Sequence, residues 1–155
     1  MRTMRILTLL LLLATLTACG SPPVRHDNVS DERINELVMY AVSLADTAYR
    51  YGGNNASAGF DCSGYVGHVY AHMLDIKLPR TSKQISRVGT PLRPAELRPG
   101  DLVFYDTQHS PYSHVGLYIG EGKFVHAPKS GSHIRVERME LSYWKLRYNG
   151  ARRVY

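Results

Sequence analysis

Cys62 lies in the segment GFDCSGYVGHVY, between an acidic residue and a hydroxyl residue. A cysteine that only fills a core behaves as a small hydrophobe and usually has apolar neighbours. A thiol becomes a nucleophile when its pKa is lowered, and the free N–H groups of a helix N-terminus favour the thiolate. The polar flanks therefore indicate nucleophilic chemistry at Cys62, completed by a histidine in a thiolate–imidazolium pair.

His114 and His126 are the best placed of the seven histidines to act with this thiol. Residues 114–127, HVGLYIGEGKFVHA, are typical of a β-hairpin in which residues 120–122 form a loop closed by a left-handed glycine. In that register His126 lies opposite Gly116, and His114 is its diagonal neighbour on the same face. Gly116 is expected to leave space beside both imidazoles.

This hairpin predicts Cys62 as nucleophile, His114 as base and His126 as the residue that orients the base. The alternative is two ordinary strand histidines. His68 and His72 lie one helical turn apart and can share a metal only with a third ligand, which no neighbouring residue supplies. We therefore expect a solvated helix face there and no metal. The remaining histidines, expected beside the cleft, at the surface and in a linker, are His109, His133 and His26.

The elements that position these residues begin with helices. Ser30 is a predicted N-cap, and apolar residues at helical spacing predict a helix of about five turns over residues 31–48. A second helix is predicted to begin at residues 61–63 and to carry an apolar stripe to Leu74. A capping-box pattern over residues 81–84 indicates a short third helix.

The second half of the chain is rich in short β-type runs. LVFYD follows a Pro-Gly turn, and HVGLYI, KFVHA and HIRVER are separated by glycine and serine. Helices followed by antiparallel strands predict an α+β domain.

The N-terminus predicts export and lipidation. Residues 1–18 combine a basic start with a short apolar run, as signal peptides do. Leu-Thr-Ala-Cys ends at Cys19 and resembles a bacterial lipobox, in which the processed cysteine carries acyl chains. Residues 19–29 are expected to be a linker, residues 30–155 the functional domain, and Cys62 an unpaired thiol. Gly20 after the cysteine favours the outer membrane by analogy.

Removal of Arg2 and Arg5 with the predicted leader lowers the formal net charge from +6 to +4, which is mild. Basic residues near the C-terminus permit a nucleic-acid partner on charge alone. The export signal argues against nucleic acid and favours an acidic polymer outside the cytoplasm or a solvated basic face. The basic residues concerned are Lys145, Arg147, Arg152 and Arg153.

The segments YRYGGNNASAGFDCSGYV, RPGDLVFY, HVGLYIG and FVHA together resemble the NlpC-type cell-wall cysteine peptidases. The resemblance runs from about residue 31 to residue 155 and is closest to the lipid-anchored murein endopeptidases of the Spr type. It implies a compact papain-like fold, with helices packed on an antiparallel sheet and the nucleophile at a helix N-terminus. It assigns the nucleophile to Cys62, the base to His114 and the third residue to His126.

The resemblance also implies a cleft. Tyr49 matches a tyrosine of the oxyanion region or pocket, and Asp61 and Ser63 match residues that line the substrate cleft in some relatives. Helix capping is the alternative role for Asp61 and Ser63, and the two roles are compatible. Tyr51 stands where the family usually has tryptophan, and Ala48 where it usually has proline, so the pocket shape is expected to differ.

The implied activity is hydrolysis of peptidoglycan stem peptides or cross-links without metal or cofactor. The D,D cross-link is the expected target, and the bond from D-Glu to the diamino acid is the alternative. The expected protein is a monomer anchored by lipid in the bacterial envelope, at the outer membrane facing the periplasm, and an adaptor protein is left open as a partner. The competing interpretations are a non-catalytic peptidoglycan-binding lipoprotein and an acyl transferase.

Overall fold

The structure, a computed structural model, describes residues 29–155. The predicted signal peptide, Cys19 and the predicted linker up to residue 28 lie outside the described residues. In the described part no helix has the length and apolar character needed to cross a bilayer. The helices are α2 (Asp31–Ser43), α3 (Cys62–Leu74), α4 (Ser82–Ile85), the short 3₁₀ helix η2 (Pro94–Glu96) and α5 (Ser142–Lys145). The strands are β1 (Asn54–Asn55), β2 (Gly59–Phe60), β3 (Thr90–Leu92), β4 (Leu102–Tyr105), β5 (His114–Gly120), β6 (Lys123–His126), β7 (Arg135–Arg138) and β8 (Tyr148–Arg153).

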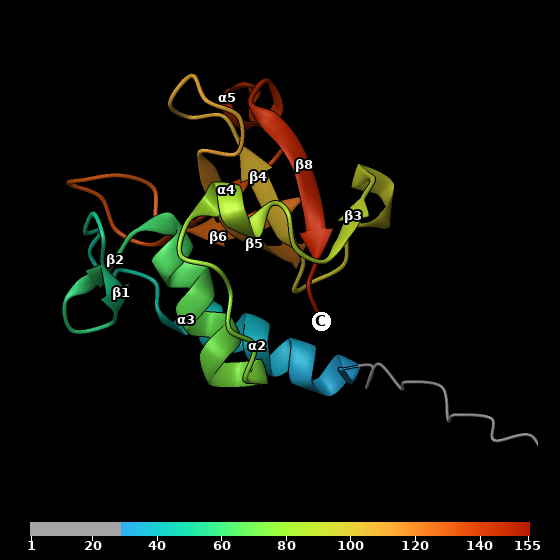
Figure 1. Cartoon of the computed structure of the whole chain (residues 1–155), viewed down its shortest axis with the longest axis horizontal. Helices are drawn as coiled ribbons and strands as arrows, with labels where there is room; N and C mark the ends of the chain where they lie inside the picture. The colour runs from blue at the N-terminus through green and yellow to red at the C-terminus, as the bar shows by residue number, and fades with distance from the viewer. Residues whose placement is uncertain (1–28) are drawn as a thin grey trace, which may run out of the picture.

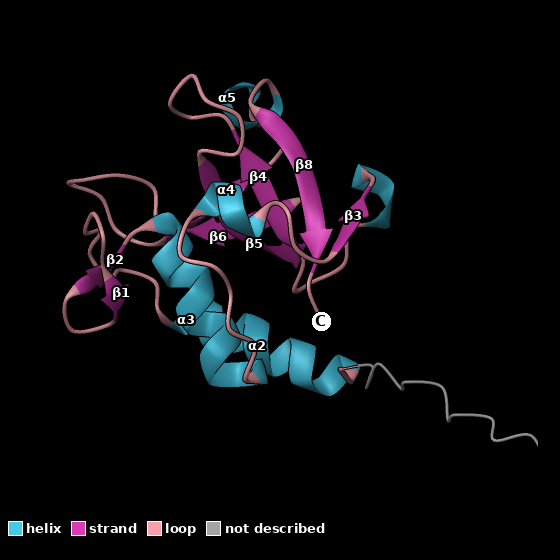
Figure 2. Cartoon of the chain, viewed as in Figure 1, coloured by secondary structure: helices cyan, strands magenta, loops and turns pink. Residues whose placement is uncertain are grey.

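A six-stranded antiparallel sheet with the order β3-β8-β4-β5-β6-β7 forms the centre of the molecule. The C-terminal strand β8 is inserted between β3 and β4, so the last strand of the chain lies inside the sheet. Helices α2 and α3 pack together on one side of it (Figure 1). The helices come early and the strands late, as Figure 2 shows, which confirms the predicted α+β class.

Helix α2 begins as predicted and ends early. The Ser30 side chain accepts a hydrogen bond from an N–H of the first turn, so Ser30 is the N-cap. The helix stops at Ser43, short of the predicted end at residue 48. The chain turns at Asp46, whose φ is 65°, and the Asp46 N–H donates to the Ile134 carbonyl at 3.1 Å. The backbone hydrogen bond to Ile134, far along the chain, thus ends the helix although apolar residues continue at helical spacing to residue 48.

Helix α3 begins at Cys62, as the sequence predicts. Asp61 is the N-cap, and its Oδ1 atom accepts a hydrogen bond from the Gly64 N–H at 2.7 Å. Helix α4 has the predicted capping box, in which Thr81 and Gln84 bond to each other's backbone N–H groups. Both helix starts depend on hydrogen bonds between residues close in the chain, which explains why the sequence predicts them.

Strands β5 and β6 form the predicted hairpin. Leu117 pairs with Val125, which puts Gly116 across from His126 and confirms the predicted register. The space beside Gly116 is filled rather than free, because a Cβ atom there would lie 2.5 Å from the Phe124 ring. The expectation of open space next to the imidazoles is therefore wrong.

The hairpin loop also differs from the prediction. Glu121 and Gly122 both have positive φ, 52° and 67°, as the central residues of a type I′ turn do. Gly120 is left-handed too, and the pairing shifts at this residue. A tight turn next to a bulge closes the hairpin and leaves the register of the histidines unchanged.

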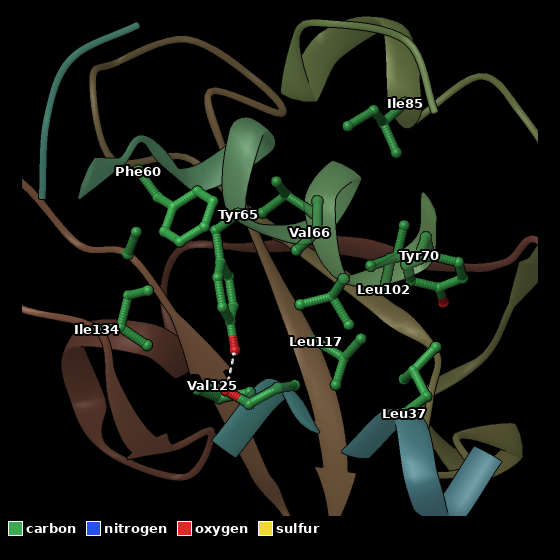
Figure 3. Packing of buried hydrophobic residues seen from close by; sticks show 14 of the residues in the cluster. Leu37, Phe60, Tyr65, Val66, Tyr70, Ile85, Leu102, Leu117, Val125 and Ile134 are labelled. Atoms are coloured by element: carbon green, nitrogen blue, oxygen red, sulfur yellow. Dashed lines mark hydrogen bonds between the residues drawn. The ribbon is translucent and has the colours of Figure 1, made fainter. Parts of the chain in front are cut away.

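The main core lies between the helices and one face of the sheet. Figure 3 shows Tyr65 of α3 reaching toward α2, where its hydroxyl donates to the Ala41 carbonyl at 2.8 Å. Burying these side chains removes apolar surface from water and fixes α3 against β5. The labelled core residues include Leu37, Phe60, Val66, Tyr70, Leu117 and Val125.

A second, smaller cluster lies on the other face of the sheet. Alternate residues of β4 and β6 point to opposite faces, so Phe104 belongs to the main core and Tyr105 to the second cluster. Trp144 of α5 covers this second face and is almost fully buried. The members of the second cluster are Val103, Tyr105, Phe124, Trp144 and Ala151.

Candidate active site

Cys62 is the first residue of α3 and opens onto a cleft of about 450 Å³. The residue is only partly exposed. Its own backbone N–H lies in the first turn of α3, where N–H groups have no partner within the helix. The cleft residues used below are Tyr49, Asp61, Ser63, Arg80 and Lys83.

The two candidate histidines bond to each other. The Nε2 atom of His114 lies 2.7 Å from the Nδ1 atom of His126, and the rings are nearly perpendicular. Both residues are buried, His126 completely. His114 does not line the cleft; the preceding residue, Ser113, does. The structure therefore places the pair just beneath the cleft surface.

Helix α3, which begins at Cys62, packs on β5, which begins at His114. The backbone N–H of Val115 acts on the Cys62 sulfur, and Val115 follows His114 directly in the chain. Among residues 29–155 no hydrogen bond joins Cys62 to the His114 ring. Because His126 occupies Nε2 of His114, only Nδ1 remains for a proton from the thiol.

Burial makes both reacting groups neutral in this structure. It raises the pKa of the Cys62 thiol to about 11, and the N–H groups of Val115 and Ser63 oppose this without reversing it. Burial also lowers the pKa of His114 to about 4 and holds that of His126 well below its ordinary value. Loss of solvation here outweighs the helix N-terminus and disfavours the expected thiolate–imidazolium pair in the resting state, and that pair stays a prediction.

Asp61 and Ser63 form a network with Arg80. Both Asp61 oxygens accept from the Arg80 guanidinium, at 3.0 and 2.7 Å, and Oδ2 also accepts from the Gly52 N–H at 3.0 Å. The same guanidinium donates to the Ser63 hydroxyl at 3.0 Å. Although burial works against the charge, these bonds and the Gly64 N–H keep the pKa of Asp61 below its usual value. The capping role of Asp61 is present, and Asp61 is therefore a paired anion in the cleft.

The sequence of the described domain matches a known family. Residues 46–153 match the NlpC/P60 family. The chain belongs to the NlpC/P60 family. This confirms the resemblance read from the four sequence segments, and the predicted class of fold.

Curated relatives within the NlpC/P60 family differ in their named activities. Murein DD-endopeptidase MepH of Escherichia coli is 42% identical over 68% of this chain and 40% of its own length. Murein DD-endopeptidase MepS/Murein LD-carboxypeptidase of the same species is 42% identical over 68% of this chain and 55% of its own. Gamma-DL-glutamyl hydrolase of Bacillus subtilis is 36% identical over 76% of this chain and 28% of its own. The chain thus spans about a quarter to a half of the length of these relatives.

A solved NlpC/P60 structure supports the fold. The crystal structure of an NlpC/P60 family protein from Bacillus cereus ATCC 10987 superposes with a TM-score of 0.72 at 29% identity. It covers 77% of this chain and 39% of that one. The arrangement of helices on an antiparallel sheet is therefore that of the NlpC/P60 family.

Tyr49 lies on the cleft wall of this NlpC/P60 domain, together with Cys62. Its backbone N–H donates to the Ser132 carbonyl at 2.8 Å, which fixes the segment directly after the predicted end of the first helix. Burial, followed by the charges of Cys62 and Asp61, raises the pKa of the Tyr49 phenol. Tyr49 is thus a proton donor near the thiol. Tyr51, which stands where the family usually has tryptophan, is 85% exposed.

The other histidines of the NlpC/P60 domain do not line the cleft, although Gln108 and Ser110 on either side of His109 do. The Tyr40 hydroxyl is 2.8 Å from Nε2 of His68, and the Tyr40 ring stacks on His72 at 4.7 Å. These contacts join α2 to α3, so the helix face is packed more than expected. Residues 29–155 contain no cluster of three or more side chains suited to a metal. His109 lines a separate pocket beside Arg147, and His133 is exposed.

Two of the basic residues near the C-terminus make separate contacts within the fold. Arg153 forms an ion pair at 2.7 Å with Asp101, which is fully buried. The Arg147 guanidinium lies 3.9 Å above the Tyr143 ring. Two of the cations are thus already engaged within the fold.

Sequence reasoning missed two residues of the site, Arg80 and Trp144. Arg80 directly precedes the capping box at Thr81, and an acidic N-cap beside the nucleophile is a signal that a cation is needed. Trp144 contacts both histidines, with ring centroids 5.8 Å from His114 and 4.9 Å from His126. No pattern in the sequence around Trp144 predicts this contact.

Proposed function

We propose that this chain is a cysteine peptidase that hydrolyses amide bonds in the stem peptides or cross-links of peptidoglycan. The observation that carries the proposal is the position of Cys62 at the N-terminus of α3, beside the buried His114–His126 pair. Membership of the NlpC/P60 family supports it, as do the murein endopeptidases among the relatives.

The proposed mechanism uses only side chains and backbone of this chain. His114 Nδ1 takes the proton of the Cys62 thiol as the sulfur attacks the amide carbonyl. The negative charge that develops on the carbonyl oxygen is stabilised by the Cys62 backbone N–H, with Tyr49 as a second donor. His114 then gives its proton to the leaving amine, which breaks the C–N bond and leaves a thioester on Cys62.

Water completes the cycle. His114 accepts a proton from water, the resulting hydroxide attacks the thioester, and the carboxylic acid product leaves as Cys62 recovers its proton. His114 donates a hydrogen bond from Nε2 to Nδ1 of His126. This contact keeps Nδ1 of His114 free for the proton transfers. Because the resting thiol is neutral, the thiolate exists only while His114 holds the proton.

We assign the cleaved bond to the D,D cross-link. The names of MepH and MepS support this choice, whereas the name of the Bacillus subtilis relative favours a γ-D-glutamyl bond. Arg80 and Lys83 place cations in the cleft, which suits a peptide rich in carboxylates. Asp61 and Ser63 contact the substrate through the network that Arg80 organises.

Residues 1–18 act as a signal peptide in this proposal, and Cys19 carries the lipid that holds the protein at the outer membrane. Its test is membrane fractionation with labelled palmitate. Wild type should carry label in the outer membrane, and Cys19→Ser should be unlabelled and soluble in the periplasm. Label retained by Cys19→Ser would overturn this part.

One observation favours a second candidate, a non-catalytic peptidoglycan-binding protein. The neutral thiol and imidazole, which share no hydrogen bond within the described residues, fit a cleft that binds without cutting. Such a protein would bind muropeptides with the same affinity in wild type and in Cys62→Ala, and would release no product from either.

The deciding experiment is mass spectrometry of a defined cross-linked muropeptide after incubation with the purified protein. Hydrolysis adds one water across the broken bond, and the fragments identify that bond. Cys62→Ala and His114→Ala should give no fragments while keeping the circular dichroism of wild type. Undiminished cleavage by Cys62→Ala would exclude the proposed mechanism. A ligated product formed with an added amine would instead indicate acyl transfer.

A further inference from the structure

Trp144 of α5 touches both members of the histidine pair from the second face of the sheet. Its ring stacks on His114, with centroids 5.8 Å apart and planes 26° from parallel. It meets His126 edge to face, with centroids 4.9 Å apart and planes at 90°. Trp144 is only 6% exposed, so little water shares this contact.

His114 has to carry a positive charge for the reaction, and its surroundings oppose that charge. Burial alone lowers its pKa to about 4, and no charged side chain of the described residues offsets this. Among titratable groups, Tyr105 of β4 pairs with His114, and His126 of β6 bonds to its ring. Cys62 begins α3, which packs on β5. Arg135 on β7 lies opposite His126, and its positive charge makes a further positive charge on the pair less favourable.

The stacked indole is the group that can offset this cost. A cation over the face of an aromatic ring, within about 6 Å of its centroid, is attracted by the ring quadrupole, and tryptophan gives the strongest attraction. The attraction grows when the pair is removed from water, as it is here. The stacked geometry is already present in the neutral state, and His114 becomes a cation facing Trp144 only when it is protonated.

We propose that Trp144 is a positioning residue for the His114–His126 pair, whose indole stabilises the His114 imidazolium formed when the Cys62 proton moves to Nδ1. The inference rests on the proposed peptidase function. The step breaks the S–H bond and forms an N–H bond. The two electrons of the S–H bond stay on sulfur, and the positive charge spreads over the imidazole facing Trp144. The proton later leaves with the amine product.

The simplest alternative is that Trp144 only fills the second cluster, where it packs on Tyr105 and Phe124. A filler and a positioning residue predict different kinetics. Loss of packing lowers stability and the amount of active enzyme, whereas loss of the imidazolium contact lowers kcat and changes the pH profile. The test therefore compares variants by both measures.

The experiment measures kcat, KM and the pH dependence of muropeptide cleavage for Trp144→Leu and Trp144→Phe. Loss of the cation–π contact in Trp144→Leu should lower kcat by about 3- to 30-fold with KM unchanged. Trp144→Phe should fall between this variant and wild type. The acid limb of the profile should move to lower pH in Trp144→Leu, because the imidazolium is then harder to form.

Tyr143→Leu is the matched control, because Tyr143 packs on Trp144 at 4.8 Å and is half exposed. It should leave kcat and the acid limb unchanged. An unmoved acid limb in Trp144→Leu, or a change in KM alone, would overturn the inference. If Trp144→Leu does not fold, Trp144→Phe decides by the same two measures.

A second measurement does not depend on catalysis. Titration of His114 by ¹⁵N NMR in Cys62→Ala should give a lower pKa when Trp144 is also changed to Phe. An equal or higher value would contradict the stacking effect. If wild type fails to cleave muropeptides, the proposed function fails, and this titration still reports whether Trp144 stabilises the imidazolium.

Discussion

His114 Nε2 and His126 Nδ1 lie 2.7 Å apart, and Nε2 of His126 is buried without a hydrogen-bond partner among the described residues. His114 can accept a proton at Nδ1 only if its own hydrogen is on Nε2. That hydrogen must be donated to His126 Nδ1, so His126 carries its hydrogen on the unpartnered Nε2. The rings of Phe124 and Trp144 pack against the His126 ring, and aromatic faces suit an N–H better than a lone pair.

The role of His126 as an acceptor predicts the effect of its replacement. His126→Leu removes the acceptor and should lower kcat by roughly 10²- to 10⁴-fold, as loss of an orienting residue does in other triads. His126→Asn keeps an acceptor near the position of Nδ1 and should retain more activity. Steady-state kinetics on a defined muropeptide provide the measurement, with the thermal midpoint as control. Equal activity in the leucine variant and wild type would exclude the orienting role.

The neutral thiol predicts slow alkylation of Cys62. With a pKa of about 11, the thiolate fraction is small at pH 7 and grows as the pH rises. The rate of labelling by iodoacetamide should therefore rise by about tenfold per pH unit from pH 7 to pH 9.5, without a plateau. Mass spectrometry of a Cys19→Ser protein, in which Cys62 is the remaining thiol, gives the rates.

The His114→Ala variant is the matched control for this measurement. Because His114 is neutral at neutral pH in this structure and does not stabilise a thiolate by its charge, its removal should not slow labelling. A plateau below pH 7 that disappears in His114→Ala would show a preformed thiolate–imidazolium pair, contrary to this structure.

The Asp61–Arg80 network predicts a loss of stability when it is broken. Asp61→Ala removes the N-cap of α3 and leaves Arg80 unpaired, so the free energy of unfolding should fall by about 1–3 kcal/mol. The lowered pKa of Asp61 means that this stabilisation is present above pH 3.8 and is lost as the pH falls through the lowered value. Urea denaturation at pH 7 and at acid pH measures both effects.

An exposed ion pair is the control for this network. Arg93 and Glu96 lie at the surface, and Arg93→Ala should leave the urea midpoint unchanged. The importance of the Asp61–Arg80 pair would be refuted by equal midpoints for wild type and Asp61→Ala at pH 7.

Two glycines predict opposite effects of the same substitution. Gly116→Ala puts a Cβ atom 2.5 Å from the Phe124 ring and should cost about 1–3 kcal/mol of stability. It should also lower kcat, because Phe124 packs against His126. Gly67→Ala in α3 meets no atom within 4 Å and should stabilise the protein by about 0.5–1 kcal/mol. Thermal unfolding compares the two, and a stabilised Gly116→Ala would contradict the packing described here.

Local signals made much of the fold predictable. Ser30, Asp61 and Thr81 cap their helices through bonds to residues within the first turn, which a short stretch of sequence reveals. The hairpin register could be predicted because His126 and Gly116 follow the alternation of a two-faced strand pair. Their pairing also brought the two histidines together in the prediction.

Features that depend on distant parts of the chain were not predictable. The early end of α2 follows from a bond between Asp46 and Ile134, and the place of β8 in the sheet depends on β3 and β4. The contact of Trp144 with His114 requires α5 to fold over the sheet. The pKa of Cys62 is determined by burial, which no local pattern measures. The catalytic assignments and the lipid anchor remain predictions.

The enclosure of Cys62 also affects its resistance to oxidation. Peroxides convert thiolates, and only slowly thiols, to sulfenic and then to irreversible sulfinic acids. A sulfur whose pKa is about 11 stays protonated at neutral pH. Burial by the fold therefore slows peroxide oxidation of the resting thiol at neutral pH.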